Sequence, residues 1–216
     1  MIYPFFKRLF DIVFSFLLIL ILALPMLIIA LCIVIESRGG ALFKQERLGK
    51  NAKVFKIYKF RSMCVGAESK GSGVYSASGD PRVTKVGRFI RATSLDELPQ
   101  LFNIFLGQMS FIGPRPVLTY HPWPLEEYTE NQKRRFSVRP GITGLAQING
   151  RKNTPWTQRI KYDLEYTEKI SLLTDIKILF STVAKMFKQD SNLSAVDENG
   201  KAIPTNINTE KEGINN

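Results

Sequence analysis

The chain contains little cysteine and almost no histidine: two cysteines and one histidine in 216 residues. Cys32 and Cys64 form no CxxC pair and supply no disulfide framework, so a reducing, cytosolic setting is expected. The single histidine, His121, excludes a site built from several imidazoles. Neither the GxxxxGK[ST] pattern nor the GxGxxG pattern occurs, which excludes the two standard glycine-rich nucleotide cradles.

Acidic residues are also scarce relative to basic ones. Lysine and arginine total 30 against 19 acids, which gives a formal net charge of +11. Such a balance favours anionic partners such as phosphate esters, acidic lipid or nucleic acid. The length suits one domain with a sizeable core and a short appendage.

A long uncharged run lies near the start of the chain. The 24 residues from Ile12 to Ile35 carry no charge and are long enough to cross a bilayer as a straight helix. Pro25 lies near the middle, where proline removes a backbone hydrogen bond and bends a helix. Basic residues flank both ends: Lys7 and Arg8 before the run, and Arg38, Lys44, Arg47, Lys50, Lys53 and Lys56 after it. Because basic flanks stay in the cytosol, we expect a helix broken at Pro25 that enters and leaves by the cytosolic face, with a single straight span as the alternative.

The rest of the chain indicates an α+β fold. Its expected components are the re-entrant N-terminal membrane helix, amphipathic helices at the membrane surface, and a small β-hairpin or sheet. We divide the chain into a membrane helix at 1–36, a cytosolic catalytic domain at 37–187, and a polar, disordered tail at 188–216.

Local patterns predict the elements of the catalytic domain. Residues 41–63 indicate two strands around a Gly-Lys-Asn turn, and residues 64–82 a polar loop. Residues 82–94 have the spacing of a basic amphipathic helix, and a strongly apolar helix follows the acid pair of "DELPQLFNIFLGQM". We expect loops at "FIGPRPV" and "VRPGITGLAQING", and one long final helix from Thr157 to Phe187.

The adjacent acids Asp96 and Glu97 admit two interpretations. With Asp96 as the N-cap of a helix, Pro99 falls at N3, where its missing N–H costs nothing. The acids would then serve only the positive end of that helix. A carboxylate held ionised at a helix terminus is also a competent nucleophile for phosphoryl transfer. The two roles are compatible, because a helix end that favours the acid also favours an incoming phosphate.

Three basic residues are candidates for holding phosphate. Lys59 and Arg61 in "YKFRSM" have the i, i+2 spacing that places them on one face of a strand. Arg115 lies between two prolines in "GPRP", which stiffen its backbone for a bidentate phosphate contact. The alternatives are a solvated edge strand for the first pair and a surface turn for Arg115.

Several segments together resemble the bacterial sugar transferases, the monotopic phosphoglycosyl transferases. They are "FKQERLGKNAKVFKIYKFRSM", "GDPRVTKVGRFIRATSLDELPQLFNIFLGQMSFIGPRP", "RPGITGLAQINGR" and "YDLEYTEKISLLTDIKIL", and the resemblance covers about residues 5 to 187. It implies transfer of a sugar-1-phosphate from a UDP-sugar to a polyprenol phosphate (undecaprenyl phosphate) with release of UMP. This is the step that initiates assembly of a surface glycan such as an exopolysaccharide, a capsule or a glycoprotein glycan. It also implies a monotopic enzyme at the cytoplasmic face of the bacterial inner membrane.

The resemblance also assigns roles to residues. Asp96 and Glu97 match the catalytic dyad, with Asp96 forming a covalent phosphosugar intermediate and Glu97 assisting through a metal or through proton transfer. The basic residues of the family's motifs match Lys59, Arg88, Arg115 and Arg139. Together with Arg61, taken from its spacing to Lys59, these are the expected phosphate-binding residues. The expected cofactor is Mg²⁺, and its expected ligands are Asp96, Glu97 and Asp163.

Alternatives from other classes are a non-catalytic, membrane-tethered polyanion-binding protein and a catalytically dead scaffold. The basic residues are spread among apolar anchors and no aromatic RNA-binding motif occurs, so nucleic acid is not an expected partner. The expected partners are the UDP-sugar, the polyprenol phosphate and the membrane, and a homodimer is left open. The sequence does not indicate which sugar is transferred.

Overall fold

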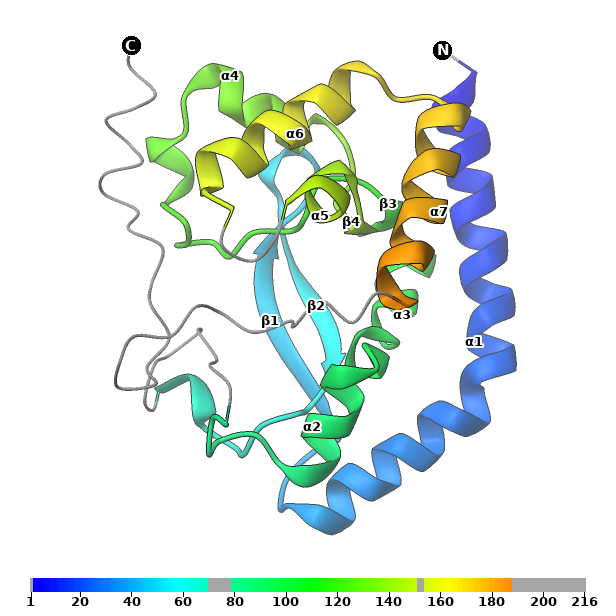
Figure 1. Cartoon of the computed structure of the whole chain (residues 1–216), viewed down its shortest axis with the longest axis vertical. Coiled ribbons are helices and arrows are strands. Elements are labelled where there is room, and N and C mark those ends of the chain that lie inside the picture. The colour runs from blue at the N-terminus through cyan, green and yellow to red at the C-terminus, as the bar shows by residue number, and fades with distance from the viewer. Residues whose placement is uncertain (1, 70–78, 151–153, 188–216) are drawn as a thin grey trace.

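A computed structural model describes residues 2–69, 79–150 and 154–187 (Figure 1). It confirms the mixed fold, with many helices, small sheets and one long apolar helix at the N-terminus. The predicted disordered tail at 188–216 and the middle of the predicted polar loop, 70–78, lie outside the described residues.

Helix α1 (Tyr3–Glu36) is one continuous helix of 34 residues and is apolar enough to cross a membrane. Figure 1 shows that it changes direction partway along, and Pro25 is the proline inside it. Proline removes a helical hydrogen bond, so the predicted break is a bend within a continuous helix. One side of α1 packs on the domain through residues such as Met26 and Ile33, whereas most of its other large apolar side chains are exposed.

The C-terminal end of α1 is fastened to the domain by side chains. The Glu36 carboxylate accepts hydrogen bonds from the backbone N–H groups of Lys85 (2.6 Å) and Val86 (2.9 Å), at the start of helix α2 (Lys85–Ala92). In return, the Arg61 guanidinium donates to carbonyl groups at the end of α1, including that of Ser37 at 2.9 Å. The first N–H groups and the last carbonyl groups of a helix have no partner within the helix. These side chains supply hydrogen bonds that water would otherwise have to make.

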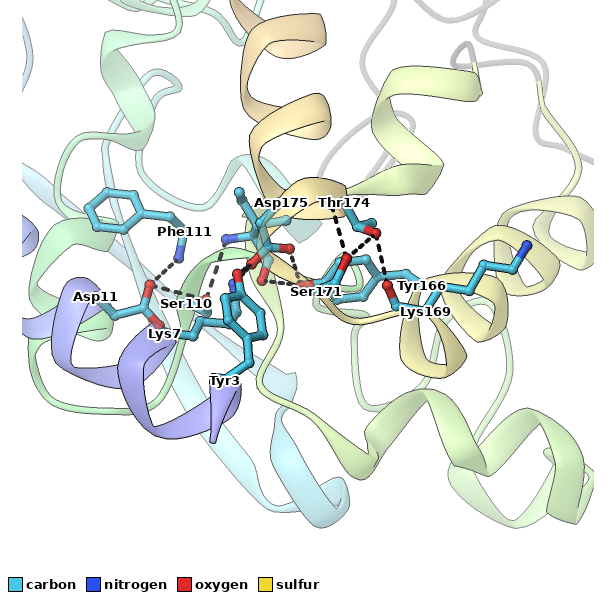
Figure 2. A network of polar contacts seen from close by, with 11 residues as sticks. Tyr3, Lys7, Asp11, Ser110, Phe111, Tyr166, Lys169, Ser171, Thr174 and Asp175 are labelled. Carbon is cyan, nitrogen blue, oxygen red and sulfur yellow. Dashed lines mark hydrogen bonds and ion pairs between the residues drawn. The ribbon is translucent and has the colours of Figure 1, made fainter. Parts of the chain in front are cut away.

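The N-terminal half of α1 carries a buried acid. Asp11 is only 2% exposed. Its Oδ1 atom accepts hydrogen bonds from the Ser110 hydroxyl and the Phe111 N–H, both at 3.1 Å (Figure 2). Because an unpaired buried carboxylate is costly, this pairing fixes the register of α1 against strand β3 (Ser110–Ile112).

A second buried acid, Asp175, connects α1 to helix α7 (Leu172–Phe187). The Tyr3 hydroxyl and the Lys7 Nζ each donate to Asp175 Oδ2 at 2.6 Å, and the Tyr166 hydroxyl donates to Oδ1 at 2.8 Å (Figure 2). We call the contacts of Asp175 with Tyr3, Lys7 and Tyr166 the N-terminal clasp. The clasp ties the first turns of α1 to the last helices of the domain.

Arg8 connects α1 to helix α3 (Gln100–Phe105). Its guanidinium donates to the carbonyl oxygens of Ile104 (2.8 Å) and Phe105 (3.0 Å) at the C-terminal end of α3. A cation at a helix C-terminus is favoured by the helix dipole as well as by the hydrogen bonds. Both ends of α1 are therefore held by the same globular body.

The predicted hairpin is confirmed. Strands β1 (Leu42–Leu48) and β2 (Val54–Phe60) pair antiparallel around the short helix η1 (Lys50–Ala52), with Arg47 opposite Phe55. The buried Asn103 of α3 pins the open edge of β2, accepting from the Tyr58 N–H at 2.9 Å and donating to the Lys56 carbonyl at 2.8 Å.

Three local predictions are wrong. The segments "FIGPRPV" and "VRPGITGLAQING" were expected to be loops, but β3 and β4 (Gly141–Thr143) form a two-stranded parallel sheet and helix α5 (Leu145–Asn149) follows. A Cβ atom on Gly141 would lie 2.1 Å from the Gly113 nitrogen, so only glycine lets the two backbones come this close. The predicted final helix is two helices, α6 (Trp156–Glu168) and α7, because the Ser171 hydroxyl accepts from the Thr174 N–H and begins a new helix.

The third error concerns the acid pair. Asp96 does not cap a helix: it lies inside the short 3₁₀ helix η3 (Leu95–Glu97), and α3 starts only after Pro99. The predicted basic amphipathic helix is confirmed as α2, whose Thr84 cap accepts from the Gly87 N–H at 2.9 Å. The remaining short helices are η2 (Ala67–Ser69), η4 (Leu125–Glu127), α4 (Glu130–Lys133) and η5 (Arg134–Ser137).

Candidate active site

The acid pair lies in a tight turn between α2 and α3. Ser94, just before η3, has a φ angle of 58°, a left-handed conformation that reverses the chain direction. Asp96 and Glu97 follow within η3, and both are half-buried. The turn therefore holds two adjacent carboxylates at the surface of the domain, partly screened from water.

A lysine from the hairpin completes this arrangement. The Lys59 Nζ lies 2.7 Å from Glu97 Oε1, and the two side chains are 20% and 26% exposed. Lys59 is near the end of β2, and the contacts of Asn103 with that strand hold β2 against α3. Two segments that are distant in sequence are thus fixed together by buried amide hydrogen bonds, and the ion pair forms where they meet.

The two acids are driven in opposite directions electrostatically. Burial raises the pKa of Asp96, and the neighbouring charge of Glu97 raises it further against the opposing charge of Lys59. Burial alone would also raise the pKa of Glu97, but the charges of Lys59 and Arg115 outweigh burial and hold that pKa below its ordinary value. Glu97 is therefore the firmly ionised member of the pair, and Asp96 is the more basic one. Such a split between two carboxyl groups is typical of sites where they have different roles.

Two arginines, Arg47 and Arg115, lie beyond Glu97, and both charges lower the pKa of that acid. Arg115 is exposed between the buried Pro114 and Pro116, and the half-buried Arg47 donates to the Pro116 carbonyl at 3.1 Å. Burial, and after it the charge of Arg115, lower the pKa of Arg47 to about 10. Within the part of the chain that the structure describes, neither arginine forms an ion pair. Two like charges held together in this way favour an anionic ligand.

Exposed apolar side chains lie on the two helices between which the acid pair lies. Phe89 of α2 and Phe102, Phe105 and Leu106 at α3 are exposed. Helices α2 and α3 both contact α1 (Figure 1). Most of the exposed large side chains of α1 are also apolar. Exposed apolar side chains gathered on neighbouring elements are typical of an interaction site.

Comparison with known proteins agrees with this geometry. The family model described as bacterial sugar transferase matches residues 2–189. The chain belongs to the bacterial sugar transferase family. The UDP-glucose:undecaprenyl-phosphate glucose-1-phosphate transferase of Klebsiella pneumoniae is 44% identical over 187 residues, which cover 84% of this chain and 40% of that relative.

Two further relatives differ from each other in how much of their length this chain covers. The undecaprenyl-phosphate galactose phosphotransferase of Salmonella typhimurium is 39% identical over 200 residues, covering 86% of this chain and 41% of that protein. The chain thus spans about 40% of the length of such relatives. The uncharacterized sugar transferase EpsL of Bacillus subtilis is 41% identical over 180 residues, which cover 83% of this chain and 86% of EpsL.

In this sugar transferase, Asp163 is placed away from the other two expected metal ligands. Asp163 is 1% exposed, and its Oδ2 atom lies 2.5 Å from a guanidinium nitrogen of Arg135, which also donates to the Arg115 carbonyl at 3.0 Å. Among residues 2–69, 79–150 and 154–187, no group of three His, Cys, Asp or Glu side chains is placed to hold a metal. Asp163 therefore braces the loop that carries Arg115 and does not join Asp96 and Glu97.

The five residues expected to bind phosphate do not all lie at the acid pair. Lys59 and Arg115 lie beside Glu97, as described above. Arg61 is buried at the end of α1, where its guanidinium serves backbone carbonyls, and Arg139 donates through Nε to the Gly107 carbonyl at 2.8 Å. Arg88 lies on the exposed face of α2, whereas Arg91 of that helix supplies a charge that lowers the pKa of Asp96 against its burial.

Sequence reasoning missed Arg47, Arg91 and Arg135. Arg47 was counted only among the basic residues that follow the membrane helix, since a lysine-rich hairpin is typical of a solvated edge. Its burial depends on a bridge to Leu118, far away in sequence. Arg91 is related to Arg88 by helical i, i+3 spacing, so the pattern of α2 could have suggested both.

Proposed function

We propose that this chain transfers a sugar-1-phosphate from a UDP-sugar to a polyprenol phosphate at the cytoplasmic face of the bacterial inner membrane. The observation that carries the proposal is the Asp96–Glu97 pair, held by Lys59, flanked by Arg47 and Arg115, and adjoining an exposed apolar surface. The names of the relatives describe undecaprenyl-phosphate sugar-phosphate transfer, which supports the same reaction class here.

The proposed chemistry has two displacements at one phosphorus atom. A carboxylate oxygen of Asp96 attacks the sugar-bearing phosphorus, the bond to the UMP oxygen breaks, and its electron pair leaves with UMP. A phosphate oxygen of the polyprenol phosphate then attacks the same phosphorus and the aspartyl oxygen leaves, which regenerates the carboxylate. The raised pKa of Asp96 favours its role as nucleophile, since the more basic carboxylate is the better one.

The basic residues stabilise the charge that develops. Lys59 lies next to the acid pair and can hold the transferring phosphate, and Arg115 can hold the leaving one. Glu97 stays ionised beside Lys59, so it orients that cation, and its negative charge raises the pKa of Asp96. These side chains contribute most to the rate when the fold already holds them in position before the substrate binds.

The donor set also fits Mg²⁺. This ion is commonly held by one or two carboxylates together with substrate phosphates, and Asp96 and Glu97 supply two adjacent carboxylates beside the arginines. When bound, Mg²⁺ supplies positive charge that neutralises the diphosphate. Because Lys59 already bonds to Glu97, the lysine and the ion would share the oxygens of this pair.

The topology follows from the contacts of α1. A straight helix of 34 residues would be roughly 50 Å long, more than the bilayer core of about 30 Å. Both of its ends are nevertheless bonded to one globular body, through Arg8 and the N-terminal clasp at one end and Glu36 and Arg61 at the other. This arrangement supports a re-entrant, monotopic helix that dips into the cytoplasmic leaflet.

Product formation tests the proposal. Purified protein in nanodiscs is given a UDP-sugar labelled with ³²P at the sugar-bearing phosphate, undecaprenyl phosphate and Mg²⁺, in a panel of sugars. Label should pass into the organic phase as one equivalent of UMP appears, because the phosphosugar moves to the lipid. A polyanion-binding protein or a dead scaffold would produce neither signal with any sugar. A labelled aspartyl peptide formed before lipid is added would support the covalent intermediate.

A further inference from the structure

Arg47 forms no ion pair with the residues that the structure describes. The side chain is half-buried, and its Nε atom is buried with no hydrogen-bond partner in the described part of the chain. Its terminal nitrogens donate to the Pro116 carbonyl and to the Gln45 side chain, and neither acceptor is ionised. The charges of Glu68 and Glu97 act on Arg47, but the Glu68 carboxylate accepts from the Gln45 amide and Glu97 Oε1 is bonded to Lys59. A guanidinium in this position lacks an anion.

An aromatic cluster follows the segment that pairs with Arg47. Arg47 forms a β-bridge with Leu118, and the chain continues from there to His121. The rings of His121 and Trp156 meet edge to face with centroids 5.4 Å apart, and the Arg159 guanidinium carbon is 4.8 Å from the centre of the Trp156 ring. All three are half-buried, so part of each remains open to a ligand.

Charges connect the cluster to the acid pair. Burial lowers the pKa of His121, and the charges of Arg47 and then Arg159 lower it further. The same Arg47 charge acts on Glu97. Arg47 is therefore near enough to both Glu97 and His121 for its charge to act on each of them.

Acids, arginines and aromatic rings that neighbour one another match the parts of a UDP-sugar. The sugar-bearing phosphate must lie at Asp96, the second phosphate next to it, and the ribose and base beyond. Nucleic-acid bases bind to proteins by stacking on aromatic rings and on guanidinium planes, which His121, Trp156 and Arg159 provide. A phosphate is the anion that a buried guanidinium binds best in its fork geometry.

We propose that Arg47, His121, Trp156 and Arg159 form a nucleotide subsite that binds the UMP half of the substrate. Arg47 binds the phosphate that leaves with UMP, and the His121–Trp156–Arg159 cluster stacks the pyrimidine. The inference rests on the proposed function, and it adds which residues recognise the nucleotide rather than the sugar or the lipid.

Binding of fragments tests the subsite without any turnover. Wild-type protein in nanodiscs with Mg²⁺ is titrated by calorimetry with UMP and with ribose 5-phosphate, which keeps the phosphate but lacks the base. Trp156→Ala should weaken UMP binding about tenfold and leave ribose 5-phosphate unchanged, because only the stack is lost. Trp156→Phe should restore most of the affinity. Arg47→Met should weaken both ligands, about tenfold or more, because the phosphate contact is lost.

Lys161→Met is the matched control, since Lys161 is an exposed cation on the same helix as Trp156 and Arg159. It should bind both ligands as the wild type does. If the wild type binds UMP and the Trp156 and Arg47 variants bind it equally well while remaining folded, the nucleotide lies elsewhere and the subsite is refuted, with the proposed transferase activity unaffected. If the wild type binds neither UMP nor a UDP-sugar, the proposed function itself fails and the subsite with it.

Discussion

Lys59 and Glu97 form an ion pair of 2.7 Å between the hairpin and the turn that precedes α3. The pair keeps Glu97 ionised and leaves Asp96, its neighbour in the chain, as the more basic acid. Because the pKa values of the two carboxyl groups are shifted in opposite directions, the two groups can be tested separately.

Replacement of Asp96 by asparagine should abolish turnover while the fold is retained. Asparagine has the same shape as aspartate but is a far poorer nucleophile, so the rate of UMP release should fall by more than about a hundredfold. The measurement is UMP release with near-UV circular dichroism as the check on folding. Glu126→Gln, an exposed acid in η4, is the control and should retain full activity. Substantial activity in the Asp96 variant would exclude the covalent role.

Replacement of Lys59 by methionine should raise the pKa of both carboxyl groups. Burial raises both pKa values, and Lys59 is the leading charge that opposes burial at each acid. Without this charge, Asp96 and Glu97 should lose their protons at higher pH than in the wild type. Carboxyl ¹³C NMR titration in EDTA measures the change, with Lys56→Met, an exposed lysine of β2, as the control. Unaltered titration curves would show that the ion pair does not form in solution.

Replacement of Asp163 by asparagine should destabilise the protein but leave its affinity for Mg²⁺ unchanged. The substitution leaves the buried Arg135 without its counter-charge, which typically costs about 3–5 kcal/mol. Thermal unfolding in nanodiscs measures the first effect, and Mn²⁺ binding by electron paramagnetic resonance measures the second. Glu165→Gln removes an exposed pair with Lys169 on the same helix and should change neither. Weakened metal binding in a folded Asp163 variant would instead make Asp163 a metal ligand.

Replacement of Asp175 by asparagine should loosen the first turns of α1. It removes the charge that Lys7 pairs with and weakens the hydrogen bonds from the Tyr3 and Tyr166 hydroxyls. Hydrogen exchange should speed up in the N-terminal part of α1, while the C-terminal part, which is held by Glu36 and Arg61, should stay protected. Lys177→Gln, an exposed change on α7, is the control. Equal exchange along α1 in the variant and the wild type would mean that the N-terminal clasp contributes no local stability.

Cysteines at the two ends of α1 should both face the cytosol. The Ile2 side chain is 73% exposed and a Cβ atom at Gly40 meets nothing within 4 Å, so Ile2→Cys and Gly40→Cys suit labelling in a background with Cys32→Ser and Cys64→Ser. A membrane-impermeant maleimide should label neither position in intact cells and both after permeabilisation. Labelling at one end alone in intact cells would establish a straight span.

Patterns that depend on neighbouring residues were sufficient for part of the fold. The length of the apolar run, the alternation of the hairpin and the helical spacing of α2 predicted those elements, because each is encoded within a short segment. The pairing of β3 with β4 was missed because Gly113 and Gly141, which permit close approach, also have the pattern of turns. The division between α6 and α7 was signalled by Ser171, a residue with strong preference for helix starts.

The candidate site was less accessible to such reasoning. Asp96 and Glu97 stand out in sequence, but the partners of a charged side chain depend on how distant segments fold together. Arg61 was expected to bind phosphate because it follows Lys59 by two residues, yet the end of α1 returns to this strand and occupies its guanidinium. Arg47 was overlooked for the opposite reason, since its burial appears only when Leu118 pairs with β1.

The contacts at the two ends of α1 also bear on how the protein can be produced in water. Deletion of residues 1–36 would remove Glu36 from the start of α2, leave the Arg61 guanidinium without acceptors, and uncover the apolar side chains that Met26 and Ile33 contact. A truncated fragment should therefore aggregate rather than behave as a soluble transferase. A better route is to keep α1 and replace exposed residues such as Leu20 and Leu24 with polar ones, so that the packed side of the helix is kept and only its exposed side is changed.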